Sequence, residues 1–136
     1  KELRAQVERA LALGMKPSHL DSHMGTCFAR PDFIEAYIRV AKHYGLPAFI
    51  RQPSDRLVAR LRAEGQPITH KHIEVMTNYE GPKCDDFYGL SGGKSYEEKK
   101  ASVLKLLKSL QPGITYLIFH PQRATETTEH ITGTWQ

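Results

Sequence analysis

The sequence of 136 residues predicts an α/β fold in which parallel strands alternate with helices. Apolar residues recur at helical spacing in several segments, short apolar runs lie between them, and Gly or Pro stands at most junctions. The predicted order is helix then strand, repeated along the chain, which is typical of βα units in a parallel sheet or barrel. A doubly wound open sheet would produce the same alternation, so both architectures stay open on this pattern alone.

The predicted helices are recognised by their apolar periodicity and by their end signals. The first helix stops before Gly14, and the second begins at Pro31, a residue suited to the first helical position. Ser54 caps the third helix, and the run 95–98 has the form of a capping box at the start of the fourth. The predicted helices cover residues 2–13, 31–44, 54–65 and 95–110.

The predicted strands are short runs between these helices. The clearest is 114–119, which is almost wholly apolar, as strands buried on both faces are. The segment 77–94 is rich in Gly, Pro and Asp and is predicted to be a long loop, either a functional lid or disordered, while 121–136 receives no assignment. The predicted strands cover residues 18–23, 48–50 and 114–119, and a further strand with ragged alternation is predicted within 68–76.

The composition excludes several classes of protein. With 40% hydrophobic and 25% charged residues the chain is of ordinary globular type, and its apolar runs are too short for a membrane span. The net charge of +4 is spread along the helices and no nucleic-acid-binding motif occurs, so no nucleic-acid partner is expected. Cys27 and Cys84 lie outside any CxxC pattern, and either one disulfide or two free thiols fits them.

The beginning of the sequence leads to an expectation about its domain organisation. Lys1 already lies inside a helical pattern, so residues 1–136 are expected to form a single domain that is a segment of a larger fold. Any signal peptide would precede Lys1 and would not be visible here, and a cytoplasmic location is the working expectation. A homodimer is one option for its quaternary state.

The densest cluster of chemically active side chains is the run 19–23. If this run is a strand, its period of two places His19, Asp21 and His23 on one face. Two imidazoles and a carboxylate suit a divalent metal such as zinc, with the carboxylate either binding the metal or orienting a histidine. Hydrogen-bonded structure at a strand end is the alternative interpretation.

His120 is a further candidate metal ligand, and it directly follows the apolar run 114–119. Ligands and catalytic groups gather at the carboxyl ends of parallel strands, and His23 ends its own predicted strand in the same way. The two histidines are therefore predicted to meet at one rim and to share a metal ion.

Arg51 follows the predicted strand 48–50 and is also expected at this rim. Its guanidinium could orient a substrate oxygen or a carboxylate, or it could pair with an acid of a neighbouring loop. No G-x-S-x-G, P-loop, G-x-G-x-x-G or H-E-x-x-H motif is present. The other histidines are interpreted as surface or structural residues: His43, His70, His72 and His130.

These motifs together resemble the YdjC-like family of carbohydrate deacetylases, which includes the chitooligosaccharide and hopanoid-associated deacetylases. The resemblance lies in the run 1–14 with its E-L-x-x-Q pattern, in the block Pro-Ser-His-Leu-Asp-Ser-His at 17–23, in Arg51 of Arg-x-Pro, and in His120 of His-Pro. The matches occur in the order that the family has them. The run 24–26, Met-Gly-Thr, departs from the pattern: many members have a histidine two residues after His23, giving His-x-His, whereas this sequence has Gly25 there and so no histidine to supply a further ligand.

The resemblance implies an incomplete (β/α) barrel of the polysaccharide-deacetylase type that lacks its N-terminal strands. It also implies a divalent metal ion, Mg or Zn, held by one Asp and two histidines that map onto His23 and His120. The Asp ligand and the Asp that acts as general base are expected in an Asp-Asp motif upstream of this sequence. Arg51 and Asp21 are assigned to the catalytic machinery, and His19 with Asp21 would hold His23 in the correct tautomer.

The implied reaction is hydrolysis of an N-acetyl group from an acetylated amino sugar or oligosaccharide. One alternative is another metal-dependent enzyme on a similar barrel, such as a sugar isomerase or a phosphoester hydrolase. A second is a non-catalytic carbohydrate-binding module in which the histidines serve packing. A third is a segment that folds and holds metal weakly but is inactive without the upstream Asp pair.

Overall fold

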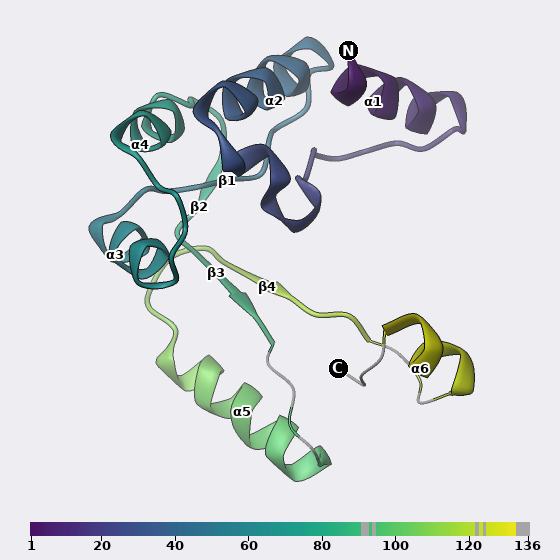
Figure 1. Ribbon diagram of the computed structural model, residues 1–136, viewed down its shortest axis with the longest axis vertical. Helices are drawn as coiled ribbons and strands as arrows, with labels where there is room; N and C mark the ends of the chain where they lie inside the picture. The colour runs from purple at the N-terminus through teal and green to yellow at the C-terminus, as the bar shows by residue number, and fades with distance from the viewer. Residues whose placement is uncertain (91–92, 94, 122, 124, 133–136) are drawn as a thin grey trace. The chain divides into compact units, whose positions relative to one another are not determined.

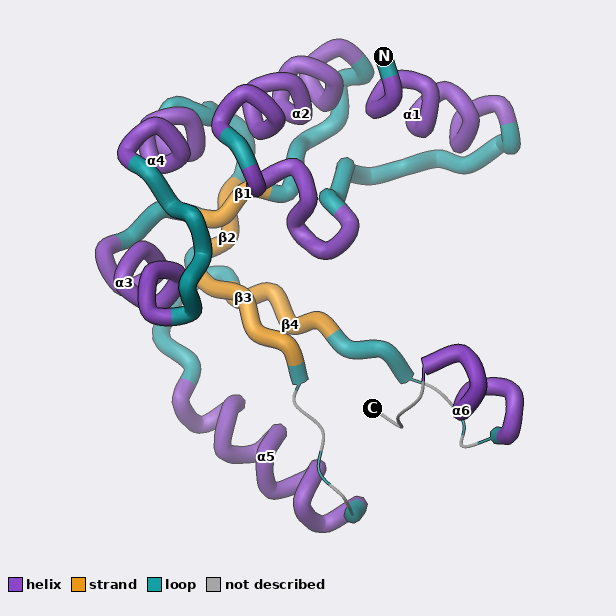
Figure 2. The backbone as a smooth tube through the Cα atoms, viewed as in Figure 1, coloured by secondary structure: helices purple, strands orange, loops and turns teal. Residues whose placement is uncertain are grey.

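The computed structural model describes residues 1–90, 93, 95–121, 123 and 125–132, and it divides the chain into two compact units, Lys1–Asp85 and Asp86–Gln136 (Figure 1). Helices and short parallel strands alternate along the chain, as the tube in Figure 2 shows, so the predicted mixed α/β class is confirmed. Among the described residues the strands form two separate two-stranded parallel sheets and no closed barrel.

The first unit contains most of the helices. Its sheet pairs β1 with β2 in parallel, with Ile50 opposite Lys83 and Arg51 opposite Cys84. A single parallel bridge joins Leu20 to Ala48, just before β1. The elements of this unit are α1 (Glu2–Ala12), the 3-10 helix η1 (His23–Ala29), α2 (Pro31–His43), β1 (Ile50–Arg51), α3 (Asp55–Ala63), α4 (His70–Thr77) and β2 (Lys83–Cys84).

The core of the first unit lies between α2, α4 and the residues around β1. Ile34, Tyr37 and Ala41 follow one another at helical spacing along α2 and are all buried. They pack with Ile50 and with Met76 of α4, both 1% exposed. Burial of each large apolar side chain stabilises the fold by about 1.5–3 kcal/mol, so α2 holds this unit together.

The end signals of the predicted helices are confirmed in three dimensions. Pro31 begins α2, and the Ser54 hydroxyl accepts a hydrogen bond of 3.2 Å from the backbone N–H of Leu57 at the start of α3. Gly14 and Gly65 follow α1 and α3 with φ of +78° and +72°, a conformation that glycine adopts without strain.

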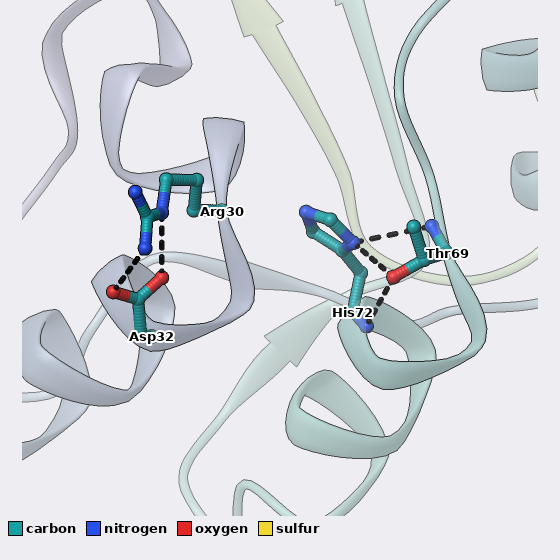
Figure 3. A network of polar contacts seen from close by, with 4 residues as sticks. All are labelled: Arg30, Asp32, Thr69 and His72. Atoms are coloured by element: carbon teal, nitrogen blue, oxygen red, sulfur yellow. Dashed lines mark hydrogen bonds and ion pairs between the residues drawn. The ribbon is translucent and has the colours of Figure 1, made fainter.

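The prediction of a strand at 68–76 is wrong, because this segment forms helix α4. The Thr69 hydroxyl accepts a hydrogen bond from the backbone N–H of His72, while His72 Nδ1 accepts one of 3.1 Å from the backbone N–H of Thr69 (Figure 3). This reciprocal capping box starts the helix. The buried residues His72, Val75 and Met76 then fall at helical spacing, which explains why the alternation expected of a strand was ragged.

Two further expectations for the first unit also differ from the structure. The segment 18–23 is not a strand, because Leu20 makes only one bridge and His23 already begins η1. The predicted loop 77–94 contains β2 and part of a second sheet; its positions 91, 92 and 94 lie outside the described residues. Both strands in it are short and pair with distant segments, so the local sequence carries little sign of them.

The second unit combines a two-stranded parallel sheet with helices. Strand β3 (Asp86–Gly89) pairs with β4 (Thr115–Ile118), α5 (Tyr96–Ser109) connects them, and α6 (Glu126–Thr132) lies in the segment that had no assignment. The rings of Phe87 and Tyr116 stack across the sheet at 5.8 Å between centroids. Strand β4 is half-buried rather than buried on both faces as predicted, and no described side chain of this unit is fully buried.

Candidate functional site

A cleft of about 300 Å³ in the first unit brings together two of the predicted site residues, Asp21 and His23. Its walls are mostly apolar side chains from α1 and α2, and η1 closes one side. The run 21–23 and Thr26 supply most of its polar lining. A concave, mostly apolar site with a few polar groups is the usual form of a small-molecule site, and this volume is at the lower end of the range for such sites.

The backbone just before Asp21 is fixed by the buried hydroxyl of Tyr37. This hydroxyl donates a hydrogen bond to the carbonyl of Leu20 and accepts one of 2.9 Å from the N–H of Phe49. Leu20 also exchanges two backbone hydrogen bonds of 2.9 Å, one with Pro47 and one with Phe49. The segment that leads into the cleft is therefore held to the core at one point.

Burial raises the pKa of the Tyr37 phenol. The hydrogen bond from Phe49 opposes this shift, and the negative charge of Asp21 adds to it. Tyr37 therefore stays a neutral hydrogen-bond donor over the physiological range, as its contact with the Leu20 carbonyl requires.

The turn that places His23 is built by Ser22. The buried Ser22 hydroxyl accepts a hydrogen bond of 2.9 Å from the N–H of Cys27, and the Ser22 carbonyl accepts one of 2.8 Å from Gly25. Met24 and Gly25 both have positive φ, of 52° and 68°, so the chain turns sharply here. As a result the His23 side chain stands at the beginning of η1, exposed beside the cleft.

The other predicted residues of the 19–23 cluster have separate surroundings. His19 is exposed and its Nδ1 lies 2.9 Å from the Ser18 hydroxyl. Asp21 is exposed and lines the cleft. Within the described part of the chain, no hydrogen bond joins His19 or Asp21 to His23, so the assignment of these two residues to the orientation of His23 stays a prediction.

Arg51 and His120 are not among the described residues that line this cleft. Arg51 is half-buried in β1 and lines a second, smaller cavity of the first unit. His120 follows β4 in the second unit, where it is exposed. Because the two units are described separately, the meeting of His23 and His120 around one ion stays a prediction.

The ring nitrogens of His23 and His120 are suitable ligands for a divalent metal ion, although two ligands do not complete a metal site. Neither His23 nor His120 makes a side-chain hydrogen bond to any residue that the structure describes, so their ring nitrogens are open to a ligand. Neutral imidazole is a common ligand of zinc and other transition metals. No group of three or more His, Cys, Asp or Glu side chains able to hold a metal occurs in the described ranges, and further ligands would be needed.

Sequence reasoning missed the two side chains that shape this region, Tyr37 and Ser22. The pattern marks Tyr37 only as an apolar residue of its helix, and Ser22 only as one letter of the 19–23 cluster. Their roles depend on hydrogen bonds to the backbone of Leu20, Phe49 and Cys27, which local sequence does not reveal.

The fold and the cleft are those of an α/β protein with a candidate small-molecule site, and comparison with known proteins identifies the class. The chain matches the family of YdjC-like proteins over residues 1–136 and therefore belongs to that family. It is 32% identical over 124 residues to a carbohydrate deacetylase of Thermus thermophilus. This match covers 88% of the chain and 42% of the relative, so the chain spans less than half of that protein's length.

Proposed function

We propose that this chain is part of a metal-dependent carbohydrate deacetylase that removes N-acetyl groups from acetylated amino sugars or oligosaccharides. The observation that carries the proposal is membership of the YdjC-like family along the whole chain, together with a relative named carbohydrate deacetylase. The cleft beside Asp21 and His23 supports it, because the motif that led to the expectation lines a cavity of suitable size.

We further propose that the two units belong to one (β/α) barrel domain of the polysaccharide-deacetylase type. Both strand pairs that the structure describes are parallel, as every pair in such a barrel must be. In each pair the partners are far apart in the sequence with at least one helix between them, which is the connection that a βα barrel requires.

In the proposed mechanism, His23 and His120 hold a magnesium or zinc ion through neutral ring nitrogens. Such an ion, when bound, supplies a water of lowered pKa and polarises the acetyl carbonyl. Hydrolysis consumes one water and breaks the amide C–N bond, which gives acetate and a free amino sugar. Asp21 orients groups at the cleft, and Arg51 orients a substrate oxygen or a carboxylate with its planar guanidinium.

The proposal is tested by metal content and acetate release in the protein that carries this chain. The substrates are N-acetylglucosamine and short N-acetylated chitooligosaccharides, assayed after chelation and after return of zinc or magnesium. We expect acetate release that chelation abolishes and metal restores. His23→Ala and His120→Ala should each lower metal affinity by more than about 100-fold, since even partners of metal ligands are worth about 10–100-fold.

His43→Ala is the matched control, because His43 is an exposed histidine of α2 that does not line the cleft. It should keep both the metal and the activity. Unchanged metal content in His23→Ala and His120→Ala would remove these residues as ligands. Release of phosphate, or isomerisation of a sugar without release of acetate, would favour the alternative enzymes on a similar barrel.

A further inference from the structure

Thr26 lines the cleft together with His23, and its hydroxyl contacts the backbone of that histidine. The hydroxyl donates a hydrogen bond of 3.1 Å to the carbonyl of His23, three residues earlier. It also lies 3.5 Å from the hydroxyl of Ser22, which accepts a hydrogen bond of 2.9 Å from the N–H of Cys27. The hydroxyls of Ser22 and Thr26 therefore join the residues before and after the turn to the backbone of His23.

The two ends of this series of contacts determine the direction of each hydrogen bond in it. A backbone N–H can only donate, and a backbone carbonyl can only accept. Each hydroxyl has one proton, and Thr26 uses its own on the carbonyl of His23, so Ser22 is the donor in the contact between the two hydroxyls. That contact is long for a hydrogen bond between hydroxyls, so the bonds at the two ends hold the turn.

The turn depends on these bonds because its own side chains provide little to hold it. Met24 and Gly25 have positive φ angles of 52° and 68°, and a residue other than glycine keeps such a conformation only where its surroundings hold it. The side chain of Met24 is 88% exposed, and the His23 ring makes no hydrogen bond to the residues that the structure describes. The position of the His23 ring therefore depends on its backbone, where the Thr26 hydroxyl bonds the carbonyl.

We propose that Thr26 is a positioning residue for metal binding by His23: its hydroxyl fixes the His23 carbonyl and so keeps the ring in the arrangement that binds the ion. Without this hydroxyl the turn populates other conformations, and the apparent metal affinity falls by the fraction of molecules that keep the binding arrangement. The effect on the metal rests on the proposed function, in which His23 is a ligand, whereas the effect on the turn does not.

The test is a zinc titration, against a competing chelator, of the protein that carries this chain. Thr26→Val keeps the branched shape without the hydroxyl and should bind zinc about tenfold more weakly, whereas Thr26→Ser keeps the hydroxyl and should bind within about threefold of the original protein. Ser109→Ala is the matched control, because the Ser109 hydroxyl makes the same kind of bond, of 2.8 Å, to the carbonyl of Leu106 in α5. It should leave the zinc affinity unchanged.

A second measurement, by NMR on the metal-free protein, tests the turn itself. In Thr26→Val the amide hydrogen of Cys27 should exchange faster and the carbonyl carbon of His23 should change its chemical shift, while Thr26→Ser should keep both near their original values. Amides of α2 and α4 are the internal reference, because a general loss of stability would speed their exchange as well. Thr26 is exposed, so the valine variant is expected to fold, and Thr26→Ala provides a second variant without the hydroxyl.

Unchanged zinc affinity in Thr26→Val, in a protein whose zinc binding is weakened by His23→Ala, would overturn the proposal and leave the proposed function standing. The same holds if Cys27 exchange and the His23 carbonyl shift are equal in the original protein and in Thr26→Val. If His23→Ala leaves zinc binding unchanged, the assignment of His23 as a ligand fails, and the effect of Thr26 on the metal fails with it. The metal-free measurement then still decides whether Thr26 holds the turn.

Discussion

The hydroxyl of Tyr37 connects the core of the first unit to the edge of the cleft. Only 3% of the residue is exposed, and its ring packs edge-on against Phe28 at 6.3 Å between centroids. The same side chain therefore fills the core with its ring and fixes Leu20, the residue before Asp21, with its hydroxyl. This dual role predicts that removal of a single oxygen affects both stability and the cleft.

Tyr37→Phe should lower the free energy of unfolding by about 0.5–1.5 kcal/mol, because it removes one of the hydrogen bonds that the part-buried carbonyl of Leu20 accepts. Urea denaturation measures this loss. Tyr44→Phe is the control: the Tyr44 hydroxyl bonds the exposed side chain of Glu8, and its loss should leave the denaturation midpoint unchanged. Equal stability of Tyr37→Phe and the original chain would contradict the role assigned to this hydroxyl.

The same residue predicts how stability depends on alkaline pH. Burial raises the pKa of Tyr37 in the folded state above its ordinary value of 10.0. The stability that comes from this shift is therefore fully present below pH 10 and is lost as the pH rises further. In denaturation experiments between pH 8 and about 11.5, the original chain should lose more stability than Tyr37→Phe. Parallel pH profiles of the two proteins would show that Tyr37 is not responsible.

At the residue scale, the structure places some of the residues that the sequence singled out together and corrects the geometry expected of others, while their roles in a site stay predictions. Asp21 and His23 do line one cleft, and the interpretation of His72 as a structural residue agrees with its role in capping α4. The prediction that His19, Asp21 and His23 share one face of a strand was wrong, because it assumed that the whole run 19–23 pairs with a neighbouring strand. Only Leu20 finds a partner strand, and that pairing depends on a distant segment around Ala48.

At the scale of elements, a helix was predicted correctly where residues at its own ends mark where it begins and stops. Helices α1, α2, α3 and α5 were predicted because capping residues and glycines mark their ends within the segment itself. Helix α4 was missed because it is short and because its capping box has His72 where such a box usually has Glu or Gln. Strands β2 and β3 are two and four residues long and are stabilised by distant partners, so no local period could reveal them.

Helix η1 leads to a prediction about backbone strain beside His23. Met24 has a φ of 52° although it is not glycine, and 88% of it is exposed, so its side chain gains little from packing. Met24→Gly should raise the free energy of unfolding by up to about 1 kcal/mol, since the left-handed conformation costs other residues about 1–2 kcal/mol. Gly25→Ala should lower it by a similar amount, because Gly25 has a φ of +68° and no atom within 4 Å of an added Cβ.

Thermal or urea denaturation of the two variants measures these opposite effects. Because Met24 is 88% exposed and a Cβ added at Gly25 would meet no atom within 4 Å, packing contributes little to either change. Destabilisation by Met24→Gly would show that the positive φ is not strained here. If Met24→Gly also changes the metal affinity at His23, the backbone strain at Met24 is connected to the candidate site. Strained residues often lie next to functional groups.

At the scale of the whole molecule, burial is distributed unevenly between the two units. Every fully buried side chain that the structure describes lies between Val7 and Cys84, in the first unit. In the second unit the large apolar residues of α5 and β4 are half-buried or exposed; Leu104 and Leu107, for example, are 47% and 45% exposed. Within the described residues, no helix is both long enough and apolar enough to cross a membrane.

This distribution predicts that the two units differ in local stability. Regions with few buried apolar contacts open at a lower free energy, so amide hydrogens of α5 and β4 should exchange faster than those of α2 and α4. Hydrogen–deuterium exchange with peptide resolution measures this difference, and we expect at least about a tenfold gap in protection, equivalent to about 1.4 kcal/mol. Ser54→Ala, which removes the cap of α3, should increase exchange in the first unit while leaving the second unchanged. Uniform protection along the chain would mean that both units unfold together, and the division at Asp85 would then have no energetic meaning.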